Sequence, residues 1–228
     1  MYKRQFPVIV PSTVSDIIDL GLHAVQLSRF SGNWVAMKLV TNLCDGLATV
    51  QVRERHGFVL PPVEVEGRAW RHHQLKSVLT PISLEQEAEL HNGRLIATKS
   101  YLEANDVNVT VRRSVDDRLG IVSYGKPFTD LMEALDLLGL DPGWPGVPPI
   151  RILKLGASYP LPERTVREFA VGLSEILVVE EKRSFVETQI KEILYPQIDR
   201  PLVLGKFDAA SAPLVPVTGC LLYTSRCV

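Results

Sequence analysis

The pattern that most constrains the fold is a regular alternation of short apolar runs and amphipathic segments after residue 118. Four apolar runs predict strands, at 119–123, 150–155, 175–179 and 202–204. Three segments between them have the apolar spacing of helices, at 129–138, 162–173 and 184–194. Strands joined through a helix pair as parallel neighbours. The order β-α-β-α-β-α-β therefore predicts an α/β fold, an open and mainly parallel doubly wound sheet with helices on its faces.

A shorter α/β unit precedes this sheet. The apolar run 6–10 predicts a strand, and 14–30 predicts a helix with Thr13 as its N-cap and Asp16 in its first turn. The apolar run 34–40 predicts a second, buried strand. A strand–helix–strand unit of this kind favours a parallel pair with a right-handed crossover.

The segment between the two units reads as a linker that contains a helix. Residues 48–52 and 58–65 favour β structure, and 67–82 are polar and irregular. A capping-box pattern at 83–86 predicts the start of a helix that runs to about Asn105. Val107–Val111 then predicts an edge strand.

Composition and charge exclude several classes of protein. With 46% apolar residues the chain is too apolar for wholesale disorder. The formal charge of −1 comes without a basic block, so we expect no nucleic-acid partner. No run approaches the roughly 20 apolar residues that span a bilayer, and no secretory signal begins the chain. We expect a cytoplasmic protein with no membrane partner.

Histidines and cysteines suggest a metal site only weakly. Four histidines fall in or near the linker, at His56, His72, His73 and His91. Their spacing fits no compact ligand set, which favours a solvated linker. The three cysteines make neither a disulfide framework nor a metal cluster. Glycine-rich nucleotide motifs, a nucleophile elbow and Cys-x-x-Cys are also absent from the sequence.

Polar residues that follow predicted strands are the candidate site residues. Gly125 and Lys126 lie between a strand and a helix, a position that either receives a phosphate or carboxylate or is a plain β-α turn. Lys38, Thr41 and Asn42 follow the strand at 34–40 and could line a cleft.

A charged run follows the predicted strand at 175–179. Glu180 and Glu181 stand at its carboxyl end, where doubly wound sheets place ligands, and could act as a pair in acid–base chemistry. The alternative, which the adjacent Lys182 and Arg183 favour, is a neutralised surface or interdomain network.

Both ends of the chain look foreign to the protein. Residues 1–5 and 220–228 can be read from opposite strands of one short DNA element that resembles a transposon end used as a sequencing adapter. We therefore expect 6–219 to be the native part, cut from a longer protein.

Several runs of the native part resemble, in order, a known enzyme family. The first group looks like the end of the pyrimidine-binding domain of indolepyruvate ferredoxin oxidoreductase, in its long fused bacterial form: Pro11–Val14, Leu20–Ala24, Leu27–Arg29, Trp34–Asn42 and Asp45–Val50. The second group resembles the transketolase C-terminal-like domain that follows: Leu119–Lys126, Ile152–Gly156, Tyr159–Leu161, Ile176–Arg183 and Val186–Lys191.

This resemblance implies an activity and a set of cofactors. The family converts aryl 2-oxo acids, coenzyme A and oxidised ferredoxin to acyl-CoA, carbon dioxide and reduced ferredoxin. It uses thiamine diphosphate held with Mg²⁺, and [4Fe-4S] clusters carry the electrons. The thiamine-activating glutamate and the diphosphate-binding motif of such enzymes fall before residue 6 and after residue 219. No catalytic or metal residue carries over to this chain, and we expect none of these cofactors to bind to it alone.

The resemblance also gives the candidate residues a setting. Lys38, Thr41 and Asn42 would line the substrate side of the thiamine cleft, and Gly125 and Lys126 would face a neighbouring domain or a coenzyme. The partners would be the missing domains of the same chain and further copies in a homo-oligomer. Two alternatives remain: a related pyruvate or branched-chain 2-oxoacid:ferredoxin oxidoreductase, and a non-catalytic α/β interaction module.

The expected domain organisation follows. It assigns 6–52 to the pyrimidine-binding domain, 53–106 to a linker with a helix, 107–208 to the transketolase C-terminal-like domain and 209–219 to the start of the next segment, with 1–5 and 220–228 non-native. Because the other strands of the first domain are missing, we expect 6–52 to keep a two-stranded remnant with an exposed apolar edge.

Overall fold

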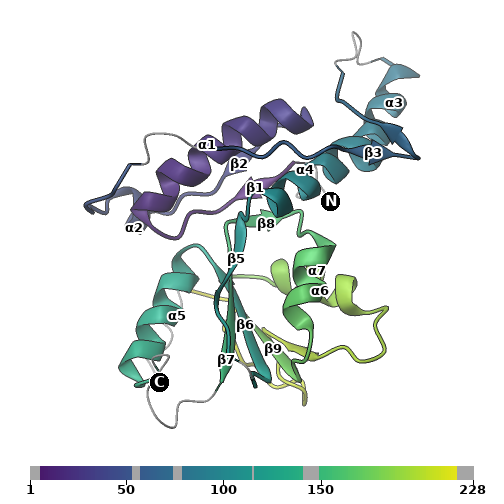
Figure 1. The fold of residues 1–228 in the computed structure, drawn as a ribbon. Coiled ribbons are helices and arrows are strands. Elements are labelled where there is room, and N and C mark those ends of the chain that lie inside the picture. Colours follow the sequence, from purple (N-terminus) through teal and green to yellow (C-terminus); the bar gives the residue numbers. More distant parts are fainter. Residues whose placement is uncertain (1–5, 53–56, 74–78, 115, 141–148, 220–228) are drawn as a thin grey trace.

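A computed structural model describes residues 6–52, 57–73, 79–114, 116–140 and 149–219. Figure 1 shows two layers, a five-stranded sheet with its helices below and a small three-stranded sheet with two long helices above. The small sheet lies over the end of the large one where the parallel strands finish, so the region of interest is the junction between the layers.

The large sheet has the order β10-β9-β6-β7-β5. Its strands are β5 (Asn108–Arg112), β6 (Leu119–Tyr124), β7 (Ile150–Leu155), β9 (Glu175–Val179) and β10 (Leu202–Leu204). All neighbours are parallel except β5, which runs antiparallel to β7 at the edge. The predicted α/β fold class and the edge strand are confirmed.

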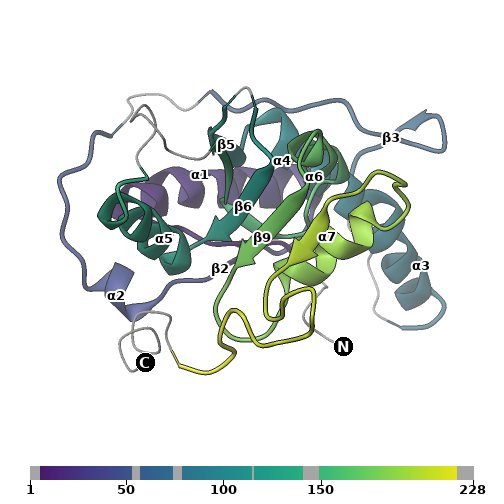
Figure 2. The same cartoon turned by 90° about the horizontal axis from the view of Figure 1, so that it is seen from below.

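Helices cover both faces of this sheet, as predicted (Figures 1 and 2). The helix α5 (Lys126–Leu137) lies on one face, and α6 (Glu163–Ala170) and α7 (Val186–Leu194) lie on the other. The α5 helix begins earlier than the predicted 129, because Pro127 fits a first helical turn that needs no donor at that position. The α6 helix ends at Ala170 rather than 173.

The upper layer differs from the predicted two-stranded remnant. It contains β1 (Val8–Ile9), α1 (Val14–Ser31), β2 (Ala36–Met37) and the short helix α2 (Thr41–Cys44). The β1 strand pairs in parallel with β2 and antiparallel with β8 (Ala157–Tyr159), which gives the order β2-β1-β8. The expectation of two strands was therefore wrong, because the chain leaving β7 supplies a third strand one residue later. The predicted strand at 34–40 is reduced to β2.

The linker is more ordered than its composition suggested. A hairpin joins β3 (Glu64–Val65), in the run 58–65 that favours β structure, to β4 (Arg68–Ala69), in the stretch 67–82 that was expected to be irregular. Both of its turn residues have a positive φ. Residues 48–52, which favour β structure by composition, form no strand. The predicted helix is present as α3 (Ile82–Glu89), a π-helical turn η2 (Leu90–Arg94) and α4 (Leu95–Ala104).

Three apolar clusters hold these layers together. One lies between the large sheet and α6 and α7, and it includes Val10 from the end of β1. A second lies between the same sheet and α5. The third packs α1 against α4 and β8, with Leu27, Tyr101 and Ala157 fully buried. Residues from β1 enter both the first and the third cluster, so the two layers share a continuous core.

Candidate functional site

The carboxyl ends of β6 and β9 form the point where the strand order of the large sheet reverses. The chain runs from β6 to β7 on one side, then returns past β6 to β9 and β10 on the other. Crevices for ligands in doubly wound sheets lie at such a switch point. Here the upper layer covers the switch point, and a narrow recess remains between them.

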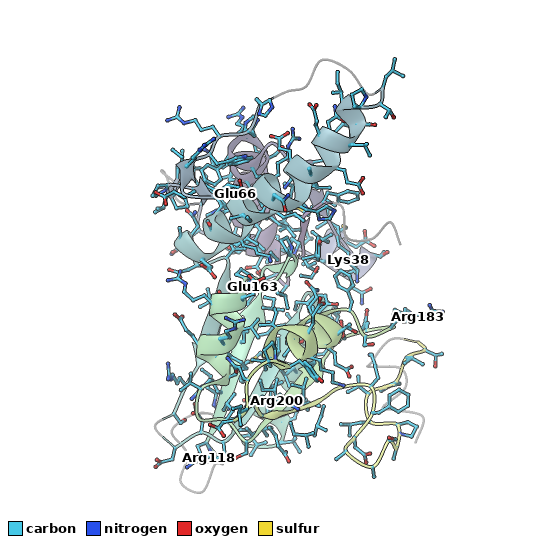
Figure 3. All side chains as sticks on the ribbon, turned by 90° about the vertical axis from the view of Figure 1, so that its right-hand side faces the viewer. Lys38, Glu66, Arg118, Glu163, Arg183 and Arg200 are labelled. Atoms are coloured by element: carbon cyan, nitrogen blue, oxygen red, sulfur yellow. The ribbon has the colours of Figure 1, made fainter. Side chains whose placement is uncertain are left out.

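The recess brings together residues from three of the predicted groups. Its lining includes Lys38 from the segment after β2, Gly125 and Lys126 from the start of α5, and Glu181 from the segment after β9. The enclosed volume is about 10 Å³, which corresponds to a single water molecule. Figure 3 shows Lys38 and Arg183 on the same side of the molecule at the level of this junction.

Two predicted cleft residues lie outside the recess. Thr41 and Asn42 are exposed on α2, and neither contributes to the lining. The chain instead contributes Val40, together with Val10 and Pro11 from the end of β1. The pattern of polar residues could not single out these apolar walls. The functional roles of Lys38, Thr41 and Asn42 stay predictions.

The turn at Gly125 has a conformation that only glycine adopts easily. Its φ is 62° and its ψ is −144°. A Cβ at this position would lie 2.8 Å from Cγ1 of Val10, so the turn also lets β1 approach the start of α5. Lys126 forms an ion pair with Asp130 one helical turn later. The lysine that was predicted to receive an anion is therefore already partnered.

Glu180 is fully buried, so the prediction that it belongs to a neutralised surface network is wrong, while the interdomain role predicted for Glu180 and Glu181 stays a prediction. Its carboxylate accepts backbone N–H groups of Phe185 (2.9 Å), Val186 (3.1 Å) and Glu187 (3.1 Å) and the hydroxyl of Tyr124 (2.8 Å). It therefore caps α7, whose own N-cap residue has no polar side chain. Burial, and then the charge of Glu180, raise the pKa of Tyr124.

The basic residues near Glu180 bind backbone carbonyls. Lys206 is buried, and its Nζ donates to the carbonyl oxygens of Glu180 and Pro216. Burial lowers the pKa of Lys206, against the opposing effect of the Glu180 and Glu187 charges. Lys182 donates to the carbonyl of Gly219 at 3.0 Å. The two lysines thus hold the segment 205–219 against the end of β9.

Metal-ligating side chains do not cluster within the described part of the chain. No group of three or more His, Cys, Asp or Glu side chains there could hold a metal ion. His72 is half-buried rather than solvated, and its Nε2 lies 2.9 Å from the carbonyl oxygen of Arg29. Cys44 is exposed on α2, and His56 lies outside the described residues. Among the described helices, none is long and apolar enough to cross a membrane.

Comparison with known proteins identifies the family. The family model described as the indolepyruvate oxidoreductase domain matches residues 109–223, about half of the chain. The chain belongs to this family. The match includes the whole large sheet except the first residue of β5, and it therefore includes the switch point.

Curated relatives extend the similarity toward the start of the chain. The indolepyruvate oxidoreductase subunit IorA of Methanothermobacter marburgensis is 27% identical over 202 residues, which are 89% of this chain and 30% of the relative. The corresponding subunit of Archaeoglobus fulgidus is 25% identical over 82% of this chain and 28% of its own length. The chain thus spans less than a third of these relatives.

Two solved structures have a similar fold. A split-gene transketolase, titled as an inactive β4 tetramer, superposes with a TM-score of 0.54 over 97% of this chain and 52% of its own, at 13% identity. A 2-oxoglutarate:ferredoxin oxidoreductase from Magnetococcus marinus superposes with a TM-score of 0.52 over 97% of this chain and 41% of its own, at 14% identity. At these identities the likeness supports the fold alone.

Proposed function

We propose that this indolepyruvate oxidoreductase domain is the central part of an enzyme that oxidatively decarboxylates aryl 2-oxo acids with coenzyme A and ferredoxin. The observation that carries the proposal is the family match over the large sheet, whose switch point is covered by the upper layer. The similarity to IorA subunits over most of the chain supports the same assignment. The parent would be a subunit or a fused chain that works as an oligomer.

The described residues do not by themselves fit the cofactors of such an enzyme. A recess of about 10 Å³ cannot enclose thiamine diphosphate, and no cluster of ligands for a metal occurs in the described ranges. We therefore assign thiamine diphosphate, Mg²⁺ and [4Fe-4S] clusters to other parts of the parent polypeptide. Under this proposal Lys38 and Lys126 form one wall of a cleft that those parts complete, and Glu181 faces them.

The test compares the activity of the 228-residue chain with that of the protein encoded by a longer reading frame from the same locus. The 228-residue chain, supplied with indolepyruvate, coenzyme A, thiamine diphosphate, Mg²⁺ and ferredoxin, should reduce no ferredoxin. The open reading frame obtained by sequencing the locus beyond both ends of 6–219 should encode a protein that does. Turnover by the chain alone would contradict the proposal. A natural stop codon near Gly219 would favour an interaction module, and oxidation of pyruvate in preference to indolepyruvate would favour the related enzyme class.

Variants of the extended enzyme test the assigned wall of the cleft. Under this proposal Lys126 exchanges its ion pair with Asp130 for a coenzyme phosphate, so Lys126→Ala should raise the KM for coenzyme A about tenfold or more, because that charge-assisted contact is lost. Arg183→Ala removes an exposed cation that does not line the recess, so this variant is the matched control and should leave that KM unchanged. Equal effects of the two variants would contradict a coenzyme contact at Lys126.

A further inference from the structure

A second concave site lies in the upper layer, away from the recess. It is a groove of about 670 Å³ between the end of α1 and the segment 60–72. Pockets for small molecules commonly have volumes of about 300–1,000 Å³ and are mostly apolar with a few polar groups. In Figure 3, Glu66 marks the tip of the adjacent hairpin, in a part of the upper layer well separated from Lys38. The groove is therefore a second candidate binding site, separate from the recess.

The aromatic walls of this groove are fixed by their surroundings. Trp70 packs its indole on Gly93, where an added Cβ would come within 2.5 Å of the indole Nε1. Its backbone N–H donates to Val63, a buried residue of the groove floor, at 2.8 Å. Phe30 stacks in a tilted arrangement on the buried Tyr101, with ring centroids 5.7 Å apart. Rigid aromatic walls bind a planar group with little loss of conformational entropy.

Among the described residues that line the groove, the side chains with a permanent charge are two arginines. Arg29 and Arg71 line it, both are exposed, and no described residue forms an ion pair or a side-chain hydrogen bond with either guanidinium. No aspartate or glutamate of the described ranges contributes to the lining. His72 holds the wall in place, since its Nε2 contacts the carbonyl oxygen of Arg29 and its ring packs on Gly32. Two guanidinium groups without an anionic partner among the described residues, in a groove with aromatic rings, suit an anion that carries a flat apolar body.

We propose that the groove binds a small anion with a planar apolar body, an aromatic carboxylate or a mononucleotide. The planar body would lie against Trp70 and Phe30, and the carboxylate or phosphate would accept hydrogen bonds from Arg29 and Arg71. This site is independent of the recess and of the oxidoreductase activity proposed above, because none of its residues lines the recess.

The direct test is calorimetric titration of the 228-residue chain with 2-naphthoate and, separately, with AMP. At least one of them should bind, and Arg29→Gln combined with Arg71→Gln should weaken that binding tenfold or more. The matched control, Arg113→Gln combined with Arg167→Gln, removes two exposed charges elsewhere and should leave the Kd unchanged. If only 2-naphthoate binds, the groove accepts aromatic carboxylates. If only AMP binds, it accepts mononucleotide phosphates.

A spectroscopic measurement on the unmodified chain keeps the test independent of variant folding. In a two-dimensional ¹⁵N–¹H spectrum the indole N–H resonance of Trp70 should shift on addition of the ligand. That of Trp34, which is 88% exposed and does not line the groove, should not shift. The variants Trp34→Phe and Trp144→Phe assign the three indole resonances. Failure of both compounds to bind, equal loss of affinity in the two double variants, or an unchanged Trp70 resonance at saturation would each overturn the proposal.

Discussion

At the scale of single residues, burial decides which charges act as structural groups. Glu180 and Lys206 are among the least exposed charged residues in the described chain, at 0% and 4%. Each is surrounded by backbone partners, so each stabilises a segment beside the recess.

The sequence predicted that Glu180 lies at a strand end, but its partner Tyr124 is 56 residues away. Periodicity carries no information about such a pairing. The one available signal was a helix, α7, that begins without a capping side chain.

Replacing Glu180 tests this assignment. Glu180→Gln puts an amide donor where two donors, Val186 N–H and the Tyr124 hydroxyl, now share Oε2. We expect a loss of about 2–3 kcal/mol in the free energy of unfolding, since hydrogen bonds to a buried charge are lost and donors face each other. Urea denaturation followed by circular dichroism measures it. Glu181→Gln, at the partly exposed neighbour, should change stability by less than about 0.5 kcal/mol. A similar effect of both would argue against the capping role.

The buried pair Arg151–Asp117 predicts how stability depends on pH. Burial alone would raise the pKa of Asp117, but its hydrogen bonds from Arg151 and Ser114 and the Arg151 charge outweigh this, so the pKa is lowered. Because the pKa is lower in the folded state, the pair stabilises the fold above the unfolded pKa of about 4. That contribution is lost as the pH falls through the folded pKa.

The corresponding experiment compares Asp117→Asn with the unmodified chain at several pH values. At pH 7 the variant should be less stable by about 3 kcal/mol, because it leaves the Arg151 guanidinium buried without its counter-charge. The difference in urea midpoint should shrink between pH 5 and pH 3. Asp116→Asn, at an exposed neighbour, controls for net charge. A difference that stays constant down to pH 3 would contradict the assignment.

At the scale of elements, fully buried strands were predictable and very short ones were not. The strands β6, β7 and β9 appear in the sequence as mainly apolar runs, although β7 contains Arg151 and Lys154, because helices cover both faces of their sheet. The strand β8 has three residues and the strands of the β3–β4 hairpin have two each, which is too short for any periodicity to be visible. For the site, the sequence located Gly125 and Glu181 at strand ends. The sequence could not predict that the end of β1 would cover these strand ends and leave a recess of only about 10 Å³.

The turn between β6 and α5 gives a prediction at this scale. Gly125→Ala should destabilise the fold by about 3 kcal/mol or more, because the side chain meets both an unfavourable backbone conformation and Val10. Gly139→Ala is the matched control, since Gly139 also has a positive φ but no atom within 4 Å of an added Cβ. Its expected cost is about 1–2 kcal/mol. Thermal unfolding of both variants measures the difference, and equal costs would show that Val10 does not restrict the turn.

At the scale of the whole molecule, the two layers share strands and core. Ile9 is fully buried in the cluster with α1 and α4, and Val10 is buried in the cluster with α6 and α7. The predicted boundary between a first domain ending at 52 and a later one starting at 107 stays a prediction. Even so, β1 from the first contacts β8 from the second through backbone pairing.

This sharing predicts a single cooperative unfolding transition. Trp144→Phe leaves Trp34 and Trp70 as fluorescence reporters of the upper layer, whereas far-UV circular dichroism reports on the whole chain. The two urea transitions should coincide. Ile9→Ala should lower stability by about 2–5 kcal/mol and move both transitions together. A fluorescence transition that precedes the circular dichroism transition would mean that the upper layer unfolds on its own.

The passage from β7 to β8 has a mechanical consequence for the recess. At Gly156 the chain moves from one sheet to the other, and this residue accepts a hydrogen bond from Val10 N–H at 2.8 Å and donates one to the Val107 carbonyl at 3.1 Å. A hinge between the layers would have to break these bonds, so the recess has a fixed width. The long side chains that line the recess, Lys38 and Lys126, can rotate without breaking these bonds, so we expect the space in the recess to change through side-chain rotation and not through movement of the layers.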